Sequence, residues 1–236
     1  MELAIKNLAV WGDSLFKGTI YDEQKNRHLQ LKEHALHIVE ETLHLPINNN
    51  CIFGCTIIKG EEKLIKTLEK NSKSGITIDA AIIEFGGNDC DFDWEQVSNR
   101  PDDDHQPKTP LNQFINSYEK MLNLLIAENI KPILVSLQPL HAPRYFQWIR
   151  RDLVPANILH WLGDIERIYR QQERYSLAIT NLAYKYQCHY IDLRSAFLKV
   201  RDYHELLCSD GIHPNQAGHQ IIAAEIIKYA QATGFK

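Results

Sequence analysis

The chain has 236 residues, of which 44% are hydrophobic and 24% charged, and its formal net charge is −4 at pH 7. These values fit one large globular domain over residues 1–236 and give no electrostatic reason to expect nucleic acid or an acidic membrane as a partner. No apolar stretch approaches the ~20 residues that cross a bilayer, so we expect no stable membrane insertion.

Apolar runs alternate with longer segments of helical period along the chain, which is typical of a parallel sheet flanked by helices. In chain order, we expect strands near Ala4–Trp11, Asn48–Phe53, Asp79–Phe85, Ile133–Leu137 and His189–Leu193. We expect helices near Leu29–Leu43, Glu61–Asn71, Leu111–Glu128, Asn157–Tyr186 and Asn215–Ala232. This pattern predicts an α/β fold, a three-layer α/β/α sandwich with a five-stranded parallel sheet of flavodoxin-like topology.

Two connections are too long for simple turns, and both follow predicted strands. Residues Gly86–Pro110 form a polar, acidic segment, and Gln138–Ala156 is rich in aromatic and basic side chains. Long loops in compact domains are often lids or binding loops, and open α/β sheets bind ligands at the carboxyl edge. We therefore expect both segments at the active-site edge of the sheet.

A serine follows the first predicted strand, and an aspartate and a histidine lie together near the end of the chain. Ser14 comes after the apolar run Leu8–Trp11, and Asp210 and His213 belong to one loop. Serine is a poor nucleophile at neutral pH unless an imidazole takes its proton, and the imidazole needs an acceptor that fixes its tautomer. The pattern predicts Ser14 as nucleophile, His213 as base and Asp210 as orienting carboxylate.

The polar motifs all follow predicted strands, so the fold should bring them to one edge of the sheet. Ser14 follows the first strand, Gly54 the second, Asn88 the third and the His213 loop the fifth. Acyl transfer also needs hydrogen-bond donors aimed at the developing oxyanion. We expect these donors to be the backbone N–H groups of Ser14 and Gly54 and the side-chain amide of Asn88.

Each motif also has a purely structural interpretation. Asp13 and Ser14 are common helix N-cap residues, and Asn215 suits the start of the last predicted helix. Gly54 suits a positive φ angle, and Gly86–Asp89 suits an ordinary turn after a strand. The shared position of these motifs at one predicted edge favours the catalytic interpretation.

These blocks resemble, in the same order, the motifs of the SGNH hydrolases, also called GDSL-type lipases and esterases. The matching segments are Gly12-Asp13-Ser14-Leu15, Gly54, Gly87-Asn88-Asp89 and Asp210-Gly211-Ile212-His213-Pro214-Asn215. The resemblance implies a flavodoxin-like three-layer fold and metal-independent hydrolysis of esters or thioesters. It also implies that the nucleophile, base, acid and oxyanion donors are the residues named above. Gly60 lies close enough to Gly54 to compete for its role.

We expect a serine esterase whose partner is a small-molecule ester with a short or medium acyl group. The alternatives among enzymes are a carbohydrate O-acetylesterase, a lysophospholipase or thioesterase, and an acyltransferase with the same triad. Outside enzymes, the alternative is a ligand-binding protein on the same fold, with the two long loops gripping the ligand. Spacing does not predict the acyl length, the alcohol moiety or the oligomeric state.

The cysteines and the amino terminus favour a reducing compartment. Five cysteines are an odd number without the spacing of a disulfide framework or a zinc site, so we expect reduced and unreactive thiols. Cys55 and Cys90 adjoin proposed oxyanion donors, so modification there is expected to block the site. Residues Met1–Lys6 lack the features of a signal peptide, which favours a cytoplasmic protein. No pattern predicts a cofactor or metal site.

Overall fold

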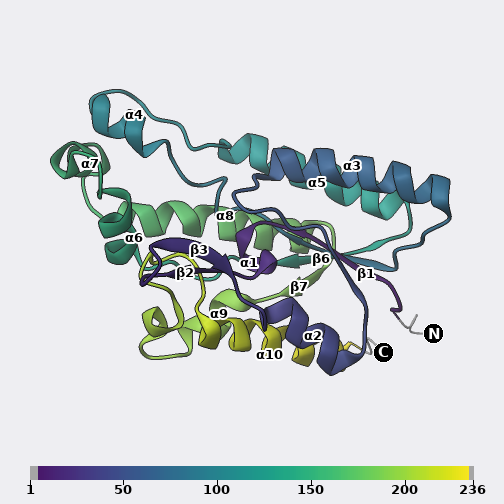
Figure 1. Cartoon of the computed structure of the whole chain (residues 1–236). Helices are drawn as coiled ribbons and strands as arrows, with labels where there is room; N and C mark the ends of the chain where they lie inside the picture. Colours follow the sequence, from purple (N-terminus) through teal and green to yellow (C-terminus); the bar gives the residue numbers. More distant parts are fainter. Residues whose placement is uncertain (1–4, 234–236) are drawn as a thin grey trace.

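A five-stranded parallel sheet forms the centre of the protein (Figure 1). In spatial order its strands are β4 (Ile47–Asn49), β1 (Leu8–Gly12), β5 (Ala80–Glu84), β6 (Lys131–Val135) and β7 (His189–Ile191). The structure, a computed structural model, describes residues 5–233. When the five strands of this sheet are numbered along the chain, their spatial order is 2-1-3-4-5. This is the order of flavodoxin-like folds, so the predicted fold class is confirmed.

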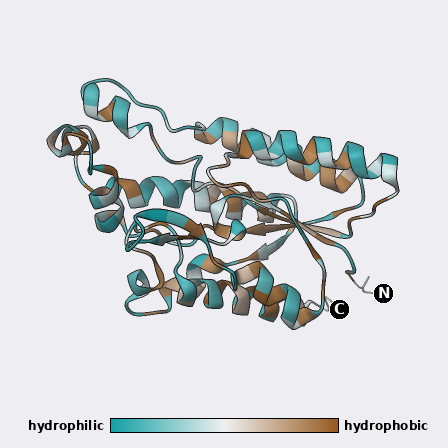
Figure 2. Cartoon of the chain, viewed as in Figure 1, coloured by the Kyte–Doolittle hydropathy of each residue, from teal (hydrophilic) through white to brown (hydrophobic). Residues whose placement is uncertain are grey.

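Helices cover both faces of the sheet, because alternate side chains of each strand point to opposite sides. In β1, Leu8 and Val10 enter one apolar cluster, whereas Ala9 and Trp11 enter the other. One face is covered by α2 (Ala35–Leu43), α9 (Leu193–Leu198) and α10 (Gln216–Ala232), and the other by α3 (Ile57–Ser74), α5 (Leu111–Ala127) and α8 (Glu166–Lys185) (Figure 1). These helices carry both apolar and polar residues, as helices with one face on a sheet should (Figure 2). Within residues 5–233, no helix has the length and apolarity that a membrane span requires.

An antiparallel hairpin occupies the segment where we expected a helix to begin at Leu29. Strands β2 (Thr19–Asp22) and β3 (Arg27–Gln30) pair with each other, and α2 begins only at Ala35. The turn between the strands includes Asn26 with a φ of 48°, a conformation that Asn adopts more readily than most residues. The predicted helix start is therefore wrong.

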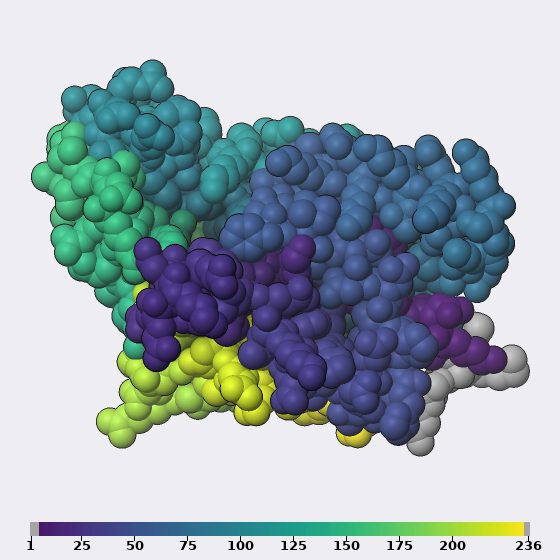
Figure 3. Space-filling view, in the orientation of Figure 1, coloured from purple at the N-terminus to yellow at the C-terminus, as the bar shows by residue number. Residues whose placement is uncertain are grey.

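The hairpin is stabilised by contacts with distant parts of the chain. The backbone N–H of Tyr21 donates to Cys208 Sγ at 3.4 Å, and Arg151 donates to the Tyr21 hydroxyl at 3.0 Å. Figure 3 shows the hairpin, in dark purple, lying between the green segment near residue 150 and the yellow segment near residue 210. Local periodicity contains no information on such contacts, which is why it misplaces the helix.

The single helix expected over Asn157–Tyr186 is divided in two. Helix α7 (Pro155–Leu162) ends at Gly163, whose φ is 74°, and α8 begins at Glu166. Only glycine adopts that conformation without strain, so the break is built into the sequence. The first strand begins at Leu8, and the part of its prediction at Ala4 lies outside the described residues.

Both long connections contain a short helix, α4 (Trp94–Asn99) in the first and α6 (Ala142–Ile149) in the second. Together with α7 they form a third apolar cluster, separate from the two clusters on the sheet; we call α4, α6 and α7 the side lobe. Figure 1 shows the side lobe at the left end of the molecule. The remaining short elements are α1 (Ser14–Lys17) and a 3₁₀ helix, η1 (Tyr203–Leu206).

Candidate active site

Ser14 is the first residue of α1 and follows β1 after one intervening residue, Asp13. The Asp13 carboxylate caps the helix by accepting from the backbone N–H of Leu15 at 2.9 Å. The capping role considered for both residues therefore belongs to Asp13. This leaves the Ser14 hydroxyl available to other partners at the carboxyl end of β1.

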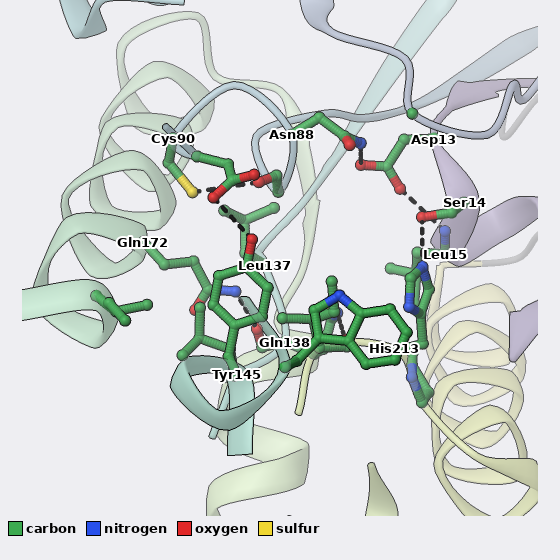
Figure 4. Close-up of a pocket in the computed structure, with 18 of the residues that line it drawn as sticks. Asp13, Ser14, Leu15, Asn88, Cys90, Leu137, Gln138, Tyr145, Gln172 and His213 are labelled. Carbon is green, nitrogen blue, oxygen red and sulfur yellow. Dashed lines mark hydrogen bonds between the residues drawn. The ribbon is translucent and has the colours of Figure 1, made fainter. Parts of the chain in front are cut away.

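Three side chains from opposite ends of the chain form one hydrogen-bonded row. His213 Nε2 lies 3.0 Å from Ser14 Oγ, and His213 Nδ1 lies 2.6 Å from Asp210 Oδ2 (Figure 4). Asp210 is fully buried, and its other oxygen accepts from the backbone N–H groups of Ile212 and His213, each at 3.1 Å. The structure thus brings Ser14, Asp210 and His213 together in the order that the serine-hydrolase chemistry needs.

The loop that holds Asp210 and His213 is shaped by a glycine and closed by a helix cap. Gly211 has a φ of 76°, and a Cβ there would lie 2.7 Å from the backbone nitrogen of Tyr145. Asn215 then caps α10 by accepting from the backbone N–H of Gly218 at 3.1 Å. The cap predicted for Asn215 is confirmed, and it fixes the chain directly after the imidazole.

Asp210 is held in its charged form by its partners. Burial raises the pKa of the Asp210 carboxyl, but the hydrogen bond and the charge of His213 lower it further, so the net shift is downward. A carboxylate at this position orients the imidazole with Nδ1 protonated and Nε2 facing Ser14. The Ser14 proton then has an acceptor at 3.0 Å.

The residues expected to donate to an oxyanion line the same cavity as the triad. The side-chain amide of Asn88 donates to Asp13 Oδ2 at 2.8 Å, which fixes the amide close to Ser14 (Figure 4). Gly54 is exposed, has a φ of 68°, and a Cβ there would meet no atom within 4 Å. The positive φ considered for Gly54 is therefore real, and it is compatible with a backbone N–H that faces a ligand.

Gly60, the competing glycine, has a different position. It lies inside α3, where a Cβ would overlap the ring of Phe85 at 2.2 Å. Glycine is needed there so that the helix can pack closely on the end of the strand. Gly54 lines the cavity and Gly60 is not among the lining residues, so the geometry favours Gly54 as the donor.

Buried carboxyl groups lie behind the triad; the sequence analysis did not identify Glu84 and named Asp89 only as part of a motif. Glu84 Oε2 accepts from the backbone N–H of Asp13 at 3.3 Å, and burial followed by the charge of Asp13 raises the pKa of Glu84 well above its usual value. Burial also raises the pKa of Asp89 to about 7, and Asp89 Oδ1 accepts from the backbone N–H of Ile57 at 2.9 Å. A charged residue at the end of the apolar run 80–85 was the available signal for Glu84.

The sequence analysis missed His28, on β3, which places a second imidazole at the site. Its Nε2 lies 3.4 Å from Asp210 Oδ2, and its ring centroid lies 4.8 Å from that of His213. Burial, followed by the charge of His213, lowers the pKa of His28. Ligand atoms of His28, Asp210 and His213 lie within 4.8 Å of one another, a donor set that suits zinc.

A cavity of about 170 Å³ opens beside Ser14 (Figure 4). The sheet edge supplies Leu137, and both long connections and α8 supply much of the remaining wall. Its apolar and aromatic lining comprises Leu15, Phe53, Phe92, Trp94, Leu137, Leu140, Tyr145, Trp148, Ile168 and Ile212. The segments 86–110 and 138–156 thus contribute side chains to the cavity that holds the candidate nucleophile.

The thiols near the site are poor nucleophiles. Burial raises the pKa of Cys55 to about 11 and raises the pKa of Cys90 well above its usual value. The thiolate is the reactive form of cysteine, so both side chains stay protonated and unreactive at neutral pH. All of the cysteines are unpaired, and Cys90 lines the cavity.

Comparisons with known proteins agree with this architecture. The model of the GDSL-like Lipase/Acylhydrolase family matches residues 10–221. No curated protein sequence matches the chain significantly. The matched segment contains the proposed triad and the proposed oxyanion donors.

Solved structures share the fold at low sequence identity. A lipase/acylhydrolase from Enterococcus faecalis is 19% identical with a TM-score of 0.67, and 96% of each chain is covered. A GDSL-like lipase from Bacteroides thetaiotaomicron is 17% identical with a TM-score of 0.62, over 97% of this chain and 88% of that one. A catalytic mutant of an acetylxylan esterase from Geobacillus stearothermophilus is 17% identical with a TM-score of 0.68, over 100% of this chain and 98% of that one.

The resemblance inferred from the sequence motifs is therefore confirmed over most of the chain, and the fold of the solved structures agrees with it. The chain belongs to the GDSL-like lipase/acylhydrolase family and is a carboxylic ester hydrolase.

Proposed function

We propose that the protein is a metal-independent serine esterase in which Ser14 is the nucleophile, His213 the base and Asp210 the orienting acid. The observation that carries this proposal is the row from Ser14 Oγ through His213 to Asp210, with distances of 3.0 and 2.6 Å. The row combines a nucleophile, a base and an orienting group within hydrogen-bond reach, which is the requirement for an activated serine.

Acylation begins when Ser14 Oγ attacks the ester carbonyl carbon and its proton passes to His213 Nε2. The Asp210 carboxylate stabilises the imidazolium that forms. His213 then returns the proton to the alcohol oxygen as the carbon–oxygen bond breaks, and the acyl group stays on Ser14. In the second half, a water molecule gives a proton to His213 and attacks the acyl carbon. The acid leaves as Ser14 recovers its proton.

The developing negative charge on the carbonyl oxygen needs fixed donors. We assign this role to the backbone N–H groups of Ser14 and Gly54 and to the amide of Asn88. One N–H of Asn88 is held by Asp13 at 2.8 Å, which leaves the second N–H for the substrate. Donors of this kind each contribute about 2.7–4 kcal/mol to transition-state stabilisation in other enzymes.

A carbohydrate O-acetylesterase is the second candidate, because an acetylxylan esterase shares the fold. That likeness, at 17% identity, concerns the fold, so the choice between the candidates depends on the cavity. A thioesterase or an acyltransferase would use the same triad with another leaving group or acceptor.

The Ser14→Ala variant tests the proposal. Because the variant has no nucleophile, kcat/KM for p-nitrophenyl butyrate should fall at least about 10³-fold while the circular dichroism spectrum stays unchanged. Ser72→Ala is the matched control, since Ser72 is exposed on α3 and should leave the rate unchanged. Activity retained by folded Ser14→Ala would exclude this mechanism. A wild-type protein that hydrolyses no ester in a broad panel would favour a ligand-binding role.

A further inference from the structure

The cavity beside Ser14 extends into the side lobe. Five of its lining residues also belong to the third apolar cluster, and each is at most 8% exposed: Phe92, Trp94, Leu140, Tyr145 and Ile168. We call these five residues the chamber. In Figure 4, Tyr145 lies across the cavity from Ser14 and His213.

The polar atoms of the chamber are already paired within its wall. The indole N–H of Trp94 and the hydroxyl of Tyr145 both donate to Asp91 Oδ1, each at 2.8 Å. Lys108 donates to the other oxygen of Asp91, also at 2.8 Å. Because these groups have partners, the two aromatic side chains have only apolar surface left to offer a ligand.

Two glutamines next to the chamber make hydrogen bonds within the protein. Gln172 donates to the backbone oxygen of Gln138 at 3.0 Å and accepts from Arg194 at 3.2 Å. Gln138 donates to the backbone oxygen of Ile212 at 3.2 Å. In the described part of the chain, no residue that lines this cavity has a buried side-chain nitrogen or oxygen without a partner.

A site that binds a sugar presents free donors and acceptors to its hydroxyl groups. The chamber instead offers aliphatic and aromatic surface, which favours an apolar chain.

The position of the chamber indicates which part of the ester it binds. His213 Nε2 must face the alcohol oxygen, because it gives that oxygen a proton. Tyr145 of the chamber lies across the cavity from His213 (Figure 4), on the side away from the leaving alcohol. The loop that carries Asn88 continues directly into the chamber wall at Phe92 and Trp94.

We propose that the chamber binds the acyl chain, so that the substrates are esters of apolar acyl groups longer than acetyl rather than acetylated sugars. This inference rests on the proposed function, since it takes Ser14 as the attacking group. Each methylene that enters the chamber should raise kcat/KM by about fourfold, the equivalent of about 0.8 kcal/mol of transfer free energy.

The test measures kcat/KM for p-nitrophenyl esters from acetate to decanoate and for acetylated xylo-oligosaccharides. In the wild type, hexanoate should exceed acetate at least about tenfold, and the acetylated sugars should be the poorest substrates. Ile168→Trp fills the chamber, so the ratio of kcat/KM for hexanoate to kcat/KM for acetate should fall at least about tenfold. The control is Leu177→Trp, on the same helix α8 but 53% exposed, which should match the wild type.

Ile168→Ala is a second test variant, for use if the larger tryptophan side chain prevents folding. It enlarges the chamber, so the preferred chain should lengthen relative to the wild type. Two results would contradict acyl-chain binding in the chamber while leaving the proposed esterase function unaffected. One is a wild-type preference for acetate or for acetylated sugars. The other is a chain-length profile that neither variant at Ile168 changes. Absence of hydrolysis with every ester would instead overturn the proposed function.

Discussion

The hydroxyl proton of Ser14 has two acceptors within reach, His213 Nε2 at 3.0 Å and the carboxyl group of Asp13 (Figure 4). One proton serves one acceptor at a time, so attack requires the rotamer that faces His213. Asn88 and the backbone N–H of Leu15 occupy the Asp13 oxygens at 2.8 and 2.9 Å. By weakening the attraction of Asp13 for the hydroxyl proton, they favour the productive rotamer.

His28 shares Asp210 Oδ2 with His213, at 3.4 Å against 2.6 Å. An N–H that donates to this oxygen reduces its attraction for the imidazolium, and a protonated His28 repels that imidazolium. The pKa of His28 is lowered, by burial first, so protonation occurs only in more acidic solution than for a free imidazole. Both effects weaken the interaction between Asp210 and His213.

We therefore predict that His28→Phe moves the acidic limb of the kcat/KM profile to higher pH. Phenylalanine keeps a ring against His213 and removes the donor, so the shift should be a few tenths of a pH unit. The kcat/KM values are measured between pH 4.5 and 9, approximately the range in which an imidazole base titrates. His160→Phe is the control, because His160 pairs with Asp102 at 2.9 Å on the exposed side lobe. An unchanged or opposite limb in His28→Phe would contradict the assignment.

The convergence of Ser14 with Asp210 and His213 was predictable, although the loop with Asp210 and His213 follows α9 and η1 rather than the end of β7 directly. Parallel strands end at one edge of the sheet, and Ser14 comes after β1. The position of His28 was not predictable, since it depends on a hairpin that docks through Tyr21 onto Cys208. Glu84 was visible only as a charged residue in an apolar run. Its burial follows from the packing of neighbouring strands, which periodicity does not describe.

Among the elements, the loop between η1 and α10 tolerates little change. Gly211 has a φ of 76°, and a Cβ there would meet the backbone of Tyr145 and His141 at 2.7 and 2.8 Å. The backbone of His141 also donates to the Gly211 carbonyl oxygen at 2.8 Å. This loop and α6 therefore fix each other, and α6 carries Tyr145 of the chamber.

We predict that Gly211→Ala lowers both stability and activity. The positive φ alone costs about 1–2 kcal/mol for alanine, and the backbone overlap forces the loop that carries His213 to move. The expected results are a lower melting temperature and a loss in kcat/KM of at least about tenfold.

Gly163→Ala is the matched control for that prediction. Its φ is 74°, but a Cβ there would meet no atom within 4 Å. It should show the backbone strain alone, with a modest loss of stability and an unchanged kcat/KM. Equal activities in the two variants would show that contact between the loop and α6 does not position the base.

Gly163 also explains why the sequence pattern mispredicts a helix boundary. The periodic pattern continues through Gly163, so one helix was expected over Asn157–Tyr186 where the structure has two. Sheet strands and long helices were found because their apolar periodicity reflects burial directly. The hairpin and the helix break depend on turn conformation and distant contacts.

At the scale of the whole molecule, the sheet order places the ends of β1 and β5 side by side, which brings Ser14 and Asn88 together. This convergence was predictable from the order of strands and motifs. The chamber was not, because it forms where the two long connections pack against each other through side chains of α4, α6 and α7. Topology thus predicts which polar motifs converge, while the packing of irregular segments shapes the cavity.

Labelling with a fluorophosphonate probe, followed by peptide mass spectrometry, tests the central claim most directly. Ser14 Oγ should form a bond to phosphorus as the bond to fluoride breaks and the proton passes to His213. We predict one adduct per chain, on the peptide that contains Ser14, formed at least about 100-fold faster than in His213→Ala. An unlabelled wild-type protein, or an adduct that persists in Ser14→Ala, would contradict the account.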